Sequence, residues 1–243
     1  MLDAREKTRY FRQIAIEEFG ETAQEKLKAA RVLVAGAGGL GCTVSLLLAA
    51  AGVGSLRLAD HGRVELGNLN RQLLYTVGDE GRLKVEAASR RLSALNPGIS
   101  VETTSETIGP GNCADLLEGC SLAVDALDNL PTRYALNAAA VGSGIPLVHG
   151  AINGFDGQAM TVIPRRSACL MCLFQGAERT GIIPVFGSAP ALIGAVEATE
   201  AVKVLTGIGT LLTGRLLLYD GRAMSFSEIE VHRDPQCPHC GDL

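Results

Sequence analysis

The segment Arg31–Gly54 constrains the fold of this chain more than any other part of the sequence. Val32–Ala35 is a short apolar run with β-branched residues, which is typical of a strand buried in a parallel sheet. Gly36–Gly41 follows at once with the sequence GAGGLG, and Cys42–Ala51 has the composition of a buried helix. A strand, a glycine turn and a helix in this order predict a phosphate-binding turn, because the glycines let the backbone approach a pyrophosphate and the helix N-terminus offers free N–H groups.

The next strand supplies the second part of a nucleotide site. Leu56–Ala59 is apolar and is followed by Asp60, which lies 19 residues after Gly41. In dinucleotide-binding motifs a carboxylate that binds the ribose hydroxyls occurs at about this spacing. The sequence therefore predicts a nucleotide site that contains Asp60 and the glycines of the turn, which are Gly36, Gly38, Gly39 and Gly41.

A membrane-spanning helix is the competing interpretation of this segment. Val32–Leu56 has no charged residue and is long enough to cross a bilayer. Four glycines in six positions argue against such a helix, because each costs about 0.8–1 kcal/mol in a helix interior. Charged residues also follow directly, at Arg57, Asp60 and Arg63. We therefore expect no membrane span.

Charge and composition argue against two classes of binding partner. The chain has 22 basic and 26 acidic residues, a net charge of −4, and no basic tract, so we expect no nucleic acid and no acidic membrane as the main partner. Its first residues are charged and lack the apolar region of a signal peptide, which predicts a cytoplasmic location. In that compartment the seven cysteines are expected to be thiols or metal ligands rather than disulfides.

Alternating apolar strands and helices continue as far as residue 150. Such repeated units indicate an α/β fold with a parallel sheet covered on both faces, whose ligands lie outside the carboxyl ends of the strands. We expect further strands over Ile99–Thr103, Leu122–Ala126 and Pro146–His149, and helices over Glu80–Leu95, Asn112–Glu118 and Pro131–Val141.

The two ends of the chain differ from this core. The spacing of apolar residues predicts an N-terminal helix or helical arm over Ala4–Phe19 and a second helix over Thr22–Ala30. After residue 150 we expect antiparallel additions to the sheet at Phe155–Ile163, Arg215–Tyr219 and Met224–Val231. The segment Arg165–Ile182 is expected to be irregular, and mobile unless a metal holds it. We expect a long helix over Ser188–Leu205 with Ser188 as its N-cap. The chain is thus expected to be one domain, with an arm over 1–30, a nucleotide-binding core over 31–150 and a C-terminal part over 151–243.

Two C-x-x-C pairs predict a metal site. Cys169 and Cys172 form one pair and Cys237 and Cys240 the other, and four thiolates complete the tetrahedral shell of a structural zinc ion. The fold must bring the pairs together, so the metal would act as a clasp between two distant segments. Redox-active dithiols and chance are the alternatives, and His239 is an alternative ligand to one sulfur. Cys42, Cys113 and Cys120 are expected to be small buried residues.

Several features occur together in an order and spacing that are specific to one protein family. They are Arg9–Gln13 (RYFRQ), Gly36–Gly41 (GAGGLG), Asp60, Asn68–Gln72 (NLNRQ), Lys84, the segment from Asp125 to Asn129, and the two C-x-x-C pairs. Over nearly its whole length the chain resembles the ubiquitin-activating (E1-like) ThiF/MoeB/HesA superfamily. Within it, the chain looks most like MoeB-type molybdopterin-synthase adenylyltransferases and ThiF. The resemblance implies a Rossmann-like, mostly parallel sheet with antiparallel C-terminal strands and a four-cysteine zinc clasp.

The resemblance also implies a reaction. Enzymes of this kind use ATP and Mg²⁺ to adenylate the C-terminal glycine carboxylate of a small ubiquitin-like sulfur-carrier protein that ends in Gly-Gly, and they act as homodimers. An anion must then attack a polyanion, so catalysis is expected to consist of positioning and charge neutralisation. By resemblance, the glycine turn binds the nucleotide and Asp60 binds the ribose hydroxyls. The triphosphate would be held by Asn68, Arg71 and Lys84, with Gln72 supporting their loop. Asp128 would bind Mg²⁺, and Arg12 would reach the phosphates from a second subunit. Asp125 is an alternative to Asp128, because it lies only three residues earlier.

This sequence departs from the family pattern at two places. Gly62 stands where relatives often have a second acidic residue. Thr180 lies in the segment where many relatives carry a cysteine, and no cysteine occurs between Cys172 and Cys237. We therefore expect the enzyme to stop at the acyl-adenylate and a separate persulfide donor to complete sulfur transfer. Because the sequence ends at Leu243, we also expect no appended rhodanese domain.

Two other functions are compatible with parts of the sequence. The glycine turn alone permits an NAD- or FAD-dependent oxidoreductase, which would bind NAD(H) more tightly than Mg·ATP. A catalytically silent module that holds a carrier protein is the second alternative, and it would show no pyrophosphate exchange. The sequence does not specify which carrier protein, or which sulfur pathway, the chain serves.

Overall fold

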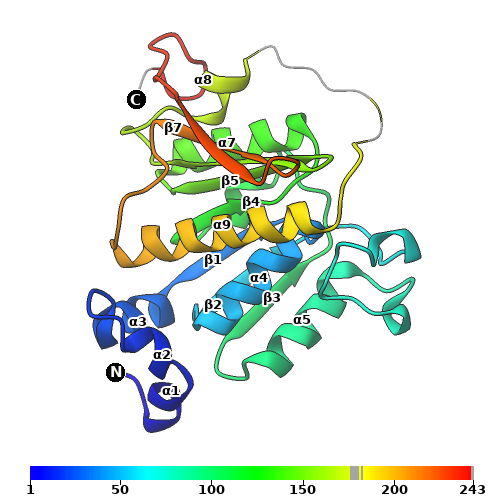
Figure 1. Ribbon diagram of the computed structural model, residues 1–243, viewed down its shortest axis with the longest axis vertical. Helices are drawn as coiled ribbons and strands as arrows, with labels where there is room; N and C mark the ends of the chain where they lie inside the picture. Colours follow the sequence, from blue (N-terminus) through cyan, green and yellow to red (C-terminus); the bar gives the residue numbers. More distant parts are fainter. Residues whose placement is uncertain (176–180, 182, 242–243) are drawn as a thin grey trace.

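The strands of this protein form one mixed sheet that runs through the whole molecule. A computed structural model describes residues 1–175, 181 and 183–241, and within these residues the strand order is β3-β2-β1-β4-β5-β6-β7-β8 (Figure 1). β1 to β5 are parallel, and β6, β7 and β8 are added in antiparallel pairs. The predicted α/β fold with antiparallel C-terminal additions is confirmed. The strands are β1 (Arg31–Ala35), β2 (Ser55–Ala59), β3 (Ser100–Thr104), β4 (Leu122–Asp125), β5 (Leu147–Asn153), β6 (Asp156–Val162), β7 (Arg215–Asp220) and β8 (Ser225–Glu230).

Helices cover both faces of the parallel strands, which is why those strands are apolar throughout. Val32 and Val34 of β1 point to one face, where α4 and α9 pack, whereas Leu33 and Ala35 point to the other, where α7 packs. Figure 1 shows these two layers on either side of the sheet. One face carries α3 (Gly20–Ala29), α4 (Gly39–Ala51), α5 (Lys84–Leu95) and α9 (Ser188–Thr206), and the other α6 (Cys113–Leu117), α7 (Leu130–Ser143) and α8 (Leu170–Phe174).

The uncharged segment that suggested a membrane helix is divided between three elements. Its residues form β1, the glycine turn with α4, and the start of β2. Among the described residues, no helix is long and apolar enough to span a membrane.

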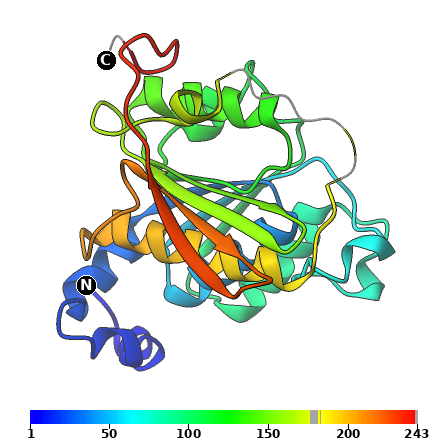
Figure 2. The same ribbon diagram turned by 45° about the horizontal axis from the view of Figure 1, so that its top comes forward.

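Of the two alternatives for Ala4–Phe19, the structure has the helical arm and not one continuous helix. The structure has α1 (Ala4–Arg9), α2 (Phe11–Ile14) and then α3, so the arm is a chain of short helices that projects at the opposite end of the molecule from the C-terminal segment (Figure 2). Tyr10 breaks the helix because its ring is buried against Gly52 and its hydroxyl accepts a hydrogen bond from Asn96 Nδ2 at 2.8 Å. Tertiary packing here overrides a local helical pattern.

Other details of the predicted elements also differ from the structure. The helix expected over Glu80–Leu95 begins only at Lys84, because Gly81 has a φ of +80° and separates it from a 3₁₀ turn at Val77–Asp79. Ser188 is the first residue of α9 rather than its N-cap, a position that Gly187 occupies without a side-chain bond. The segment Arg165–Ile182 contains the short helix α8, and its residues 176–180 and 182 lie outside the described part of the chain.

Candidate functional site

A pocket of about 1360 Å³ opens at the carboxyl ends of the parallel strands. Loops that follow β1, β2, β4 and β5 form its walls, as expected for a ligand site in an open α/β sheet. It also extends along the ends of β6, β7 and β8, where Gln158, Tyr219 and Ser227 contribute to its wall. Most of the predicted site residues line this one pocket: Gly36, Gly38, Gly39, Asp60, Asn68, Arg71, Gln72, Lys84 and Asp128.

The glycines of the turn have two different roles. Gly36 has a φ of +96°, and a Cβ there would lie 2.5 Å from the Ala126 carbonyl oxygen. A Cβ on Gly41 would lie 1.9 Å from the Gly36 carbonyl oxygen, so Gly41, which does not line the pocket, permits close packing of the turn on itself. A Cβ on Gly38 would meet only Gln72 Nε2, at 3.9 Å, and would otherwise enter the pocket. Gly38 therefore keeps space free for a ligand at the N-terminus of α4.

Asp60 joins the glycine turn to the loop after β2. Its Oδ2 accepts the Ala37 N–H at 2.7 Å, and its Oδ1 accepts the Gly62 N–H at 2.7 Å. Each carboxylate oxygen has a second lone pair that a ribose hydroxyl can use. A Cβ on Gly62 would lie 2.9 Å from Asp60 Oδ1 and 3.3 Å from Lys84 Nζ, which explains physically why a larger residue at this position requires a different arrangement.

Two cations in the pocket have no carboxylate partner among the described residues. Lys84 begins α5 and is half-buried, and Arg71 Nη1 donates to the Gly67 carbonyl and to Asn70 Oδ1, both at 2.9 Å. Neither side chain takes part in a salt bridge within the described ranges. Two uncompensated positive charges next to a helix N-terminus favour a polyanionic ligand.

Two amide side chains complete this wall. Asn68 Oδ1 accepts the Glu65 N–H at 3.4 Å and so caps a 3₁₀ turn over Leu66–Asn68, which leaves its Nδ2 for a ligand. Gln72 is buried, yet its Oε1 has no hydrogen-bond partner in the described structure. Because a buried amide oxygen without a donor is costly, Gln72 is suited to a polar group that a ligand brings.

The two candidate acidic residues after β4 are in different environments. Asp128 is exposed at the pocket, and within the described residues its carboxylate accepts one hydrogen bond, from Asn129 Nδ2 at 3.3 Å. Asp125 is fully buried and pairs with Arg133 at 3.1 Å and with His149 Nδ1 at 2.7 Å. Asp125 is therefore occupied within the protein, whereas Asp128 is free to take a ligand.

Asp125 belongs to a buried charged cluster at the pocket wall, and its two partners there were not predicted from the sequence. The cluster consists of Asp125, Arg133 of α7 and His149 of β5. Burial alone raises the pKa of Asp125, but the Arg133 guanidinium and the bond to His149 outweigh it and hold that pKa below its ordinary value. Burial lowers the pKa of His149 against the opposing effect of its bond to Asp125, and His149 Nδ1 lies 2.7 Å from Asp125 Oδ2 and 2.8 Å from Arg133 Nη1. An arginine is rarely buried unless it is paired, and the partners of Arg133 become visible only in the folded structure.

Glu197 is a second buried acid that the sequence analysis did not identify. It lies on α9, is fully buried, and has no hydrogen-bond partner for either carboxylate oxygen within the described residues. A Cβ on Gly150 would lie 2.3 Å from Glu197 Cδ, so the carboxyl group packs directly on the glycine of β5. Burial and the charge of Asp125 raise the pKa of Glu197 well above its ordinary value, against the attraction of Arg133. The surroundings of Glu197 therefore favour its protonated form.

Glu197→Gln is expected to stabilise the protein increasingly as the pH rises. Above its ordinary pKa of 4.5, the unfolded chain releases the Glu197 proton while the folded chain keeps it, so folding takes up a proton and wild-type stability falls with pH. The variant removes this loss, which amounts to about 1.4 kcal/mol per pH unit until the folded group titrates. Urea unfolding at pH 5 and pH 8 measures it. The control is Glu200→Gln, three residues on, which is expected to destabilise the protein because it replaces the carboxylate that pairs with Lys203. Equal effects of Glu197→Gln at both pH values would contradict the assignment.

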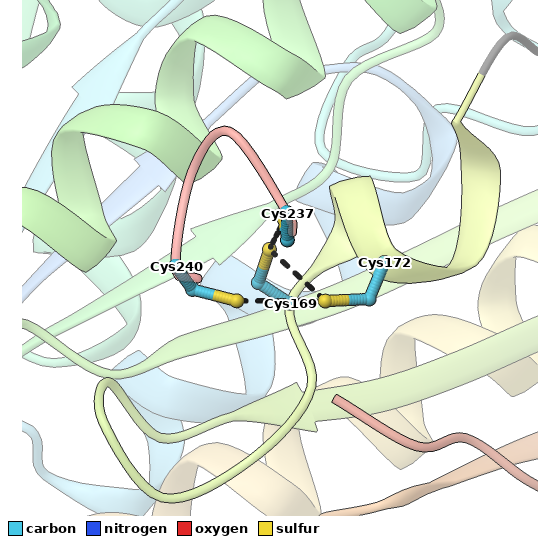
Figure 3. A group of neighbouring side chains, drawn as sticks. All are labelled: Cys169, Cys172, Cys237 and Cys240. Atoms are coloured by element: carbon cyan, nitrogen blue, oxygen red, sulfur yellow. Dashed lines mark hydrogen bonds between the residues drawn. The ribbon is translucent and has the colours of Figure 1, made fainter. Parts of the chain in front are cut away.

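The four cysteines of the C-x-x-C pairs come together, as Figure 3 shows, with their sulfur atoms pointing toward one another. Cys169 and Cys172 lie at the start of α8, and Cys237 and Cys240 lie in the C-terminal segment. The Sγ–Sγ distances include 4.0 Å between Cys169 and Cys172, 3.6 Å between Cys169 and Cys237, and 3.4 Å between Cys172 and Cys240. A disulfide requires about 2.05 Å, so these are thiols.

This geometry fits a zinc ion. A tetrahedral ion with Zn–S bonds of about 2.3 Å places its sulfur ligands about 3.8 Å apart, and the observed distances lie on either side of that value. Burial opposes ionisation of Cys172, but N–H groups that include that of Asp234, 3.5 Å away, lower its pKa below the ordinary value. His239 is not part of the cluster, since its Nδ1 is bonded to Asn137 Nδ2 at 2.8 Å. The predicted clasp of four cysteines is therefore consistent with a zinc site.

Arg12 lies far from the pocket of its own chain. It is an exposed residue of α2, and the neighbouring Gln13 is anchored to the Ala51 carbonyl at the C-terminal end of α4 by a 2.8 Å bond. The glycine turn is at the other end of that helix, about 20 Å away for 13 residues at 1.5 Å each. Arg12 can therefore contribute to a site of this kind only in another copy of the chain.

Known proteins share both the sequence and the fold. The model of the ThiF family matches residues 10–239. The sulfur carrier protein adenylyltransferase of Thermus thermophilus is 46% identical over 98% of this chain and 92% of its own length, and the SAMP-activating enzyme E1 of Haloferax volcanii is 42% identical over 99% and 91%. Among solved structures, E. coli MccB with ATP has a TM-score of 0.86 at 24% identity, over 98% of this chain and 75% of that chain. That similarity supports the fold alone.

Proposed function

Because the chain belongs to the ThiF family, we propose that it adenylates the C-terminal glycine carboxylate of a small ubiquitin-like sulfur-carrier protein. ATP is the second substrate, and pyrophosphate is released. The observation that supports the proposal most directly is the convergence of Arg71, Lys84 and Asp128 on the glycine turn in one pocket.

The pocket residues fit the physical demands of this reaction. A carboxylate oxygen of the carrier attacks the α-phosphorus, the bond to the bridging oxygen breaks, and the electron pair leaves with pyrophosphate. Both reactants are anions, so charge neutralisation and in-line positioning must lower the barrier. In this proposal Arg71, Lys84 and the Asn68 amide bind the phosphates, the N-terminus of α4 faces them through Gly38 and Gly39, and Asp60 binds the ribose hydroxyls.

A divalent cation fits the exposed carboxylate of Asp128. Magnesium ions in nucleotide sites are held by one or two carboxylates together with substrate phosphates, and Asp128 is an exposed carboxylate at the pocket wall. When bound, Mg²⁺ would withdraw charge from the phosphate oxygens.

The carrier tail would enter along the ends of β6, β7 and β8. The pocket continues in that direction beyond the glycine turn, past Gln158, Tyr219 and Asp220. A tail of two glycines has no side chains, so it needs little space in this part of the pocket. The globular part of the carrier would remain outside the pocket.

A homodimer is part of the proposal, because the site needs Arg12 of a second copy. Large apolar side chains are exposed on the arm near Arg12, with Phe11 62% and Ile16 56% accessible. Exposed apolar surface of this kind favours burial against a partner. A symmetric dimer would bury these residues and place each Arg12 at the partner's pocket.

We also propose that the enzyme releases the acyl-adenylate to a separate persulfide donor. Cys169 and Cys172 belong to the zinc cluster, and the sequence has no cysteine between Cys172 and Cys237. Burial raises the pKa of Cys42 to about 11 and also raises the pKa values of Cys113 and Cys120, so these thiols are poor nucleophiles. The position of Thr180, where relatives carry a cysteine, lies outside the described residues.

Carrier-dependent exchange between ATP and labelled pyrophosphate tests the proposal. We expect exchange only with a carrier that ends in Gly-Gly, and none when its last glycine is removed. The absence of exchange with a panel of such carriers, combined with tighter binding of NAD(H) than of Mg·ATP, would favour an oxidoreductase instead. A thioester between enzyme and carrier that survives a non-reducing gel would contradict transfer to a separate donor.

Gly38→Ala and Gly41→Ala are expected to fail in different ways. The new methyl group at residue 38 enters the pocket, so Gly38→Ala should raise the KM for ATP about tenfold, a cost of about 1.4 kcal/mol, with little change in Tm. The methyl group at residue 41 meets the Gly36 carbonyl oxygen at 1.9 Å, so Gly41→Ala should lower stability by about 3 kcal/mol or more. Thermal melts and ATP titrations of both variants separate the loss of ATP binding from the loss of stability. A Gly38→Ala protein with a much lower Tm than the wild type would contradict the role assigned to Gly38.

A further inference from the structure

The loop that carries Asp128 is held in place by hydrogen bonds to the buried side chains of Asp125 and Arg133. It runs from β4 to α7, and its residue Leu127 has both backbone groups bonded to buried side chains. The Leu127 N–H donates to Asp125 Oδ1 at 3.2 Å, and the Leu127 carbonyl accepts from Arg133 Nη2. The peptide that links Leu127 to Asp128 is therefore held in one orientation.

The Arg133 side chain also joins this loop to the neighbouring strand. Its Nη1 donates to the Gly150 carbonyl of β5 at 2.8 Å and to Asp125 Oδ2 at 3.1 Å. Its side chain is 7% exposed, and its guanidinium is committed to acceptors on the protein. A planar fork can hold three acceptors in this way, whereas the point charge of a lysine cannot.

The same loop packs against the glycine turn on its other side. The Ala126 N–H donates to the Ala35 carbonyl at 2.9 Å, and the Ala126 carbonyl oxygen lies so close to Gly36 that no side chain fits between them. Asp128 itself is exposed and has no such fixed contacts beyond Asn129 in the described structure. Its position thus depends on the backbone that precedes it.

We propose that Arg133 is a positioning residue that, together with Asp125, fixes the backbone before Asp128 and so sets where its carboxylate meets the cation and the phosphates. This inference rests on the proposed function, because that function gives Asp128 its task. Arg133 itself lines the pocket, but its guanidinium is bonded to Asp125, Leu127 and Gly150, so we assign its effect to the position of Asp128. Loss of the Arg133 guanidinium is expected to leave the binding of ATP and of the carrier intact and to misplace the Asp128 carboxylate.

Arg133→Lys tests the inference in a double-mutant cycle with Asp128→Asn. We expect Arg133→Lys to lower kcat for pyrophosphate exchange about 10- to 100-fold, with the KM for the carrier changed less than about twofold. In the Asp128→Asn background the same change should have almost no further effect, because Asp128 is already lost. A multiplicative loss in the double variant would overturn the inference. Arg90→Lys, which exchanges an exposed arginine paired with Asp79, is the control and should retain activity.

Binding of Mn²⁺ as a probe provides a readout independent of turnover. In the presence of a non-hydrolysable ATP analogue, electron paramagnetic resonance should show Mn²⁺ affinity reduced about tenfold in both Arg133→Lys and Asp128→Asn. Unchanged affinity in Arg133→Lys would overturn the inference even if the wild type catalyses exchange. If the wild type shows no exchange, the proposed function fails, but the Mn²⁺ titration still decides the role of Arg133. Should Arg133→Lys not fold, Asp125→Asn removes the same anchor and is expected to give the same pattern.

Discussion

Arg12→Ala is expected to lower carrier-dependent adenylation about a thousandfold or more, although Arg12 lies outside the pocket of its own chain. An arginine supplied from a second molecule is worth about 10³–10⁵ in rate in other phosphoryl transfers, because it neutralises charge that develops in the transition state. Because the arm is anchored at the C-terminal end of α4, Arg12 lies far from the glycine turn of its own chain, and the proposed dimer assigns it to the partner's pocket. Initial rates of pyrophosphate exchange with saturating carrier measure the loss, and Arg5→Ala, which replaces an exposed arginine on α1, is the matched control.

Mixing two inactive variants distinguishes action in trans from damage to the arm. Arg12→Ala and Asp128→Asn chains each lack one part of the site, and a mixed dimer contains one complete site. Random exchange of subunits makes half of the dimers mixed, so activity should return to about a quarter of the wild-type value. Near-wild-type activity of Arg12→Ala alone, or no recovery on mixing with Asp128→Asn, would remove Arg12 from the mechanism.

Loss of the metal clasp is expected to have the largest effect on stability. Cys237→Ser removes one of four ligands from a cluster that joins α8 to the C-terminal segment, and three of its cysteines belong to the buried core on the α7 face of the sheet. Loss of a structural metal is among the few changes that cost about 4–5 kcal/mol or more. For a chain of this size that corresponds to a fall in Tm of roughly 10–15 °C.

Zinc content and thermal melts check this expectation. The wild type should contain one zinc ion per chain, and Cys237→Ser should contain much less. Cys120→Ser also removes a buried cysteine, but one outside the cluster, so it should keep a full complement of zinc. If strong chelation leaves the Tm of the wild type unchanged, the cluster does not act as a metal clasp. Activity should fall with the metal, since Phe174 at the end of α8 packs edge-on against His149 at the pocket wall.

The parts of the fold that follow from local chemistry were predictable from the sequence. The glycine turn at Gly36–Gly41, the buried strands and the two C-x-x-C pairs each have a short-range pattern, and the structure has the turn, the strands and the cluster. The division of the arm at Tyr10 was not predictable, because it depends on packing against Gly52. The same holds for the late start of α5, where a left-handed Gly81 interrupts a helical pattern.

The buried cluster of Asp125, Arg133 and His149 could not be predicted from the sequence for a different reason. Asp125 and His149 are opposite each other in the parallel pairing of β4 with β5, and that register is a property of the sheet. Arg133 is one of several arginines in the sequence, and nothing local marks it as buried. The sequence placed Asp125 and Asp128 three residues apart as alternatives, but it could not show that one is enclosed with an arginine and a histidine while the other is exposed.

The cysteine cluster also has a consequence for how the chain is made. Cys169 and Cys172 leave the ribosome long before Cys237 and Cys240, and 68 residues separate each contacting pair across the cluster. During synthesis two thiols are therefore accessible to oxidants and to copper or iron, while the last strands of the sheet are still missing. Cotranslational folding of this protein can be completed only when the final ligands emerge, so its yield in cells is expected to depend on the supply of zinc at that moment.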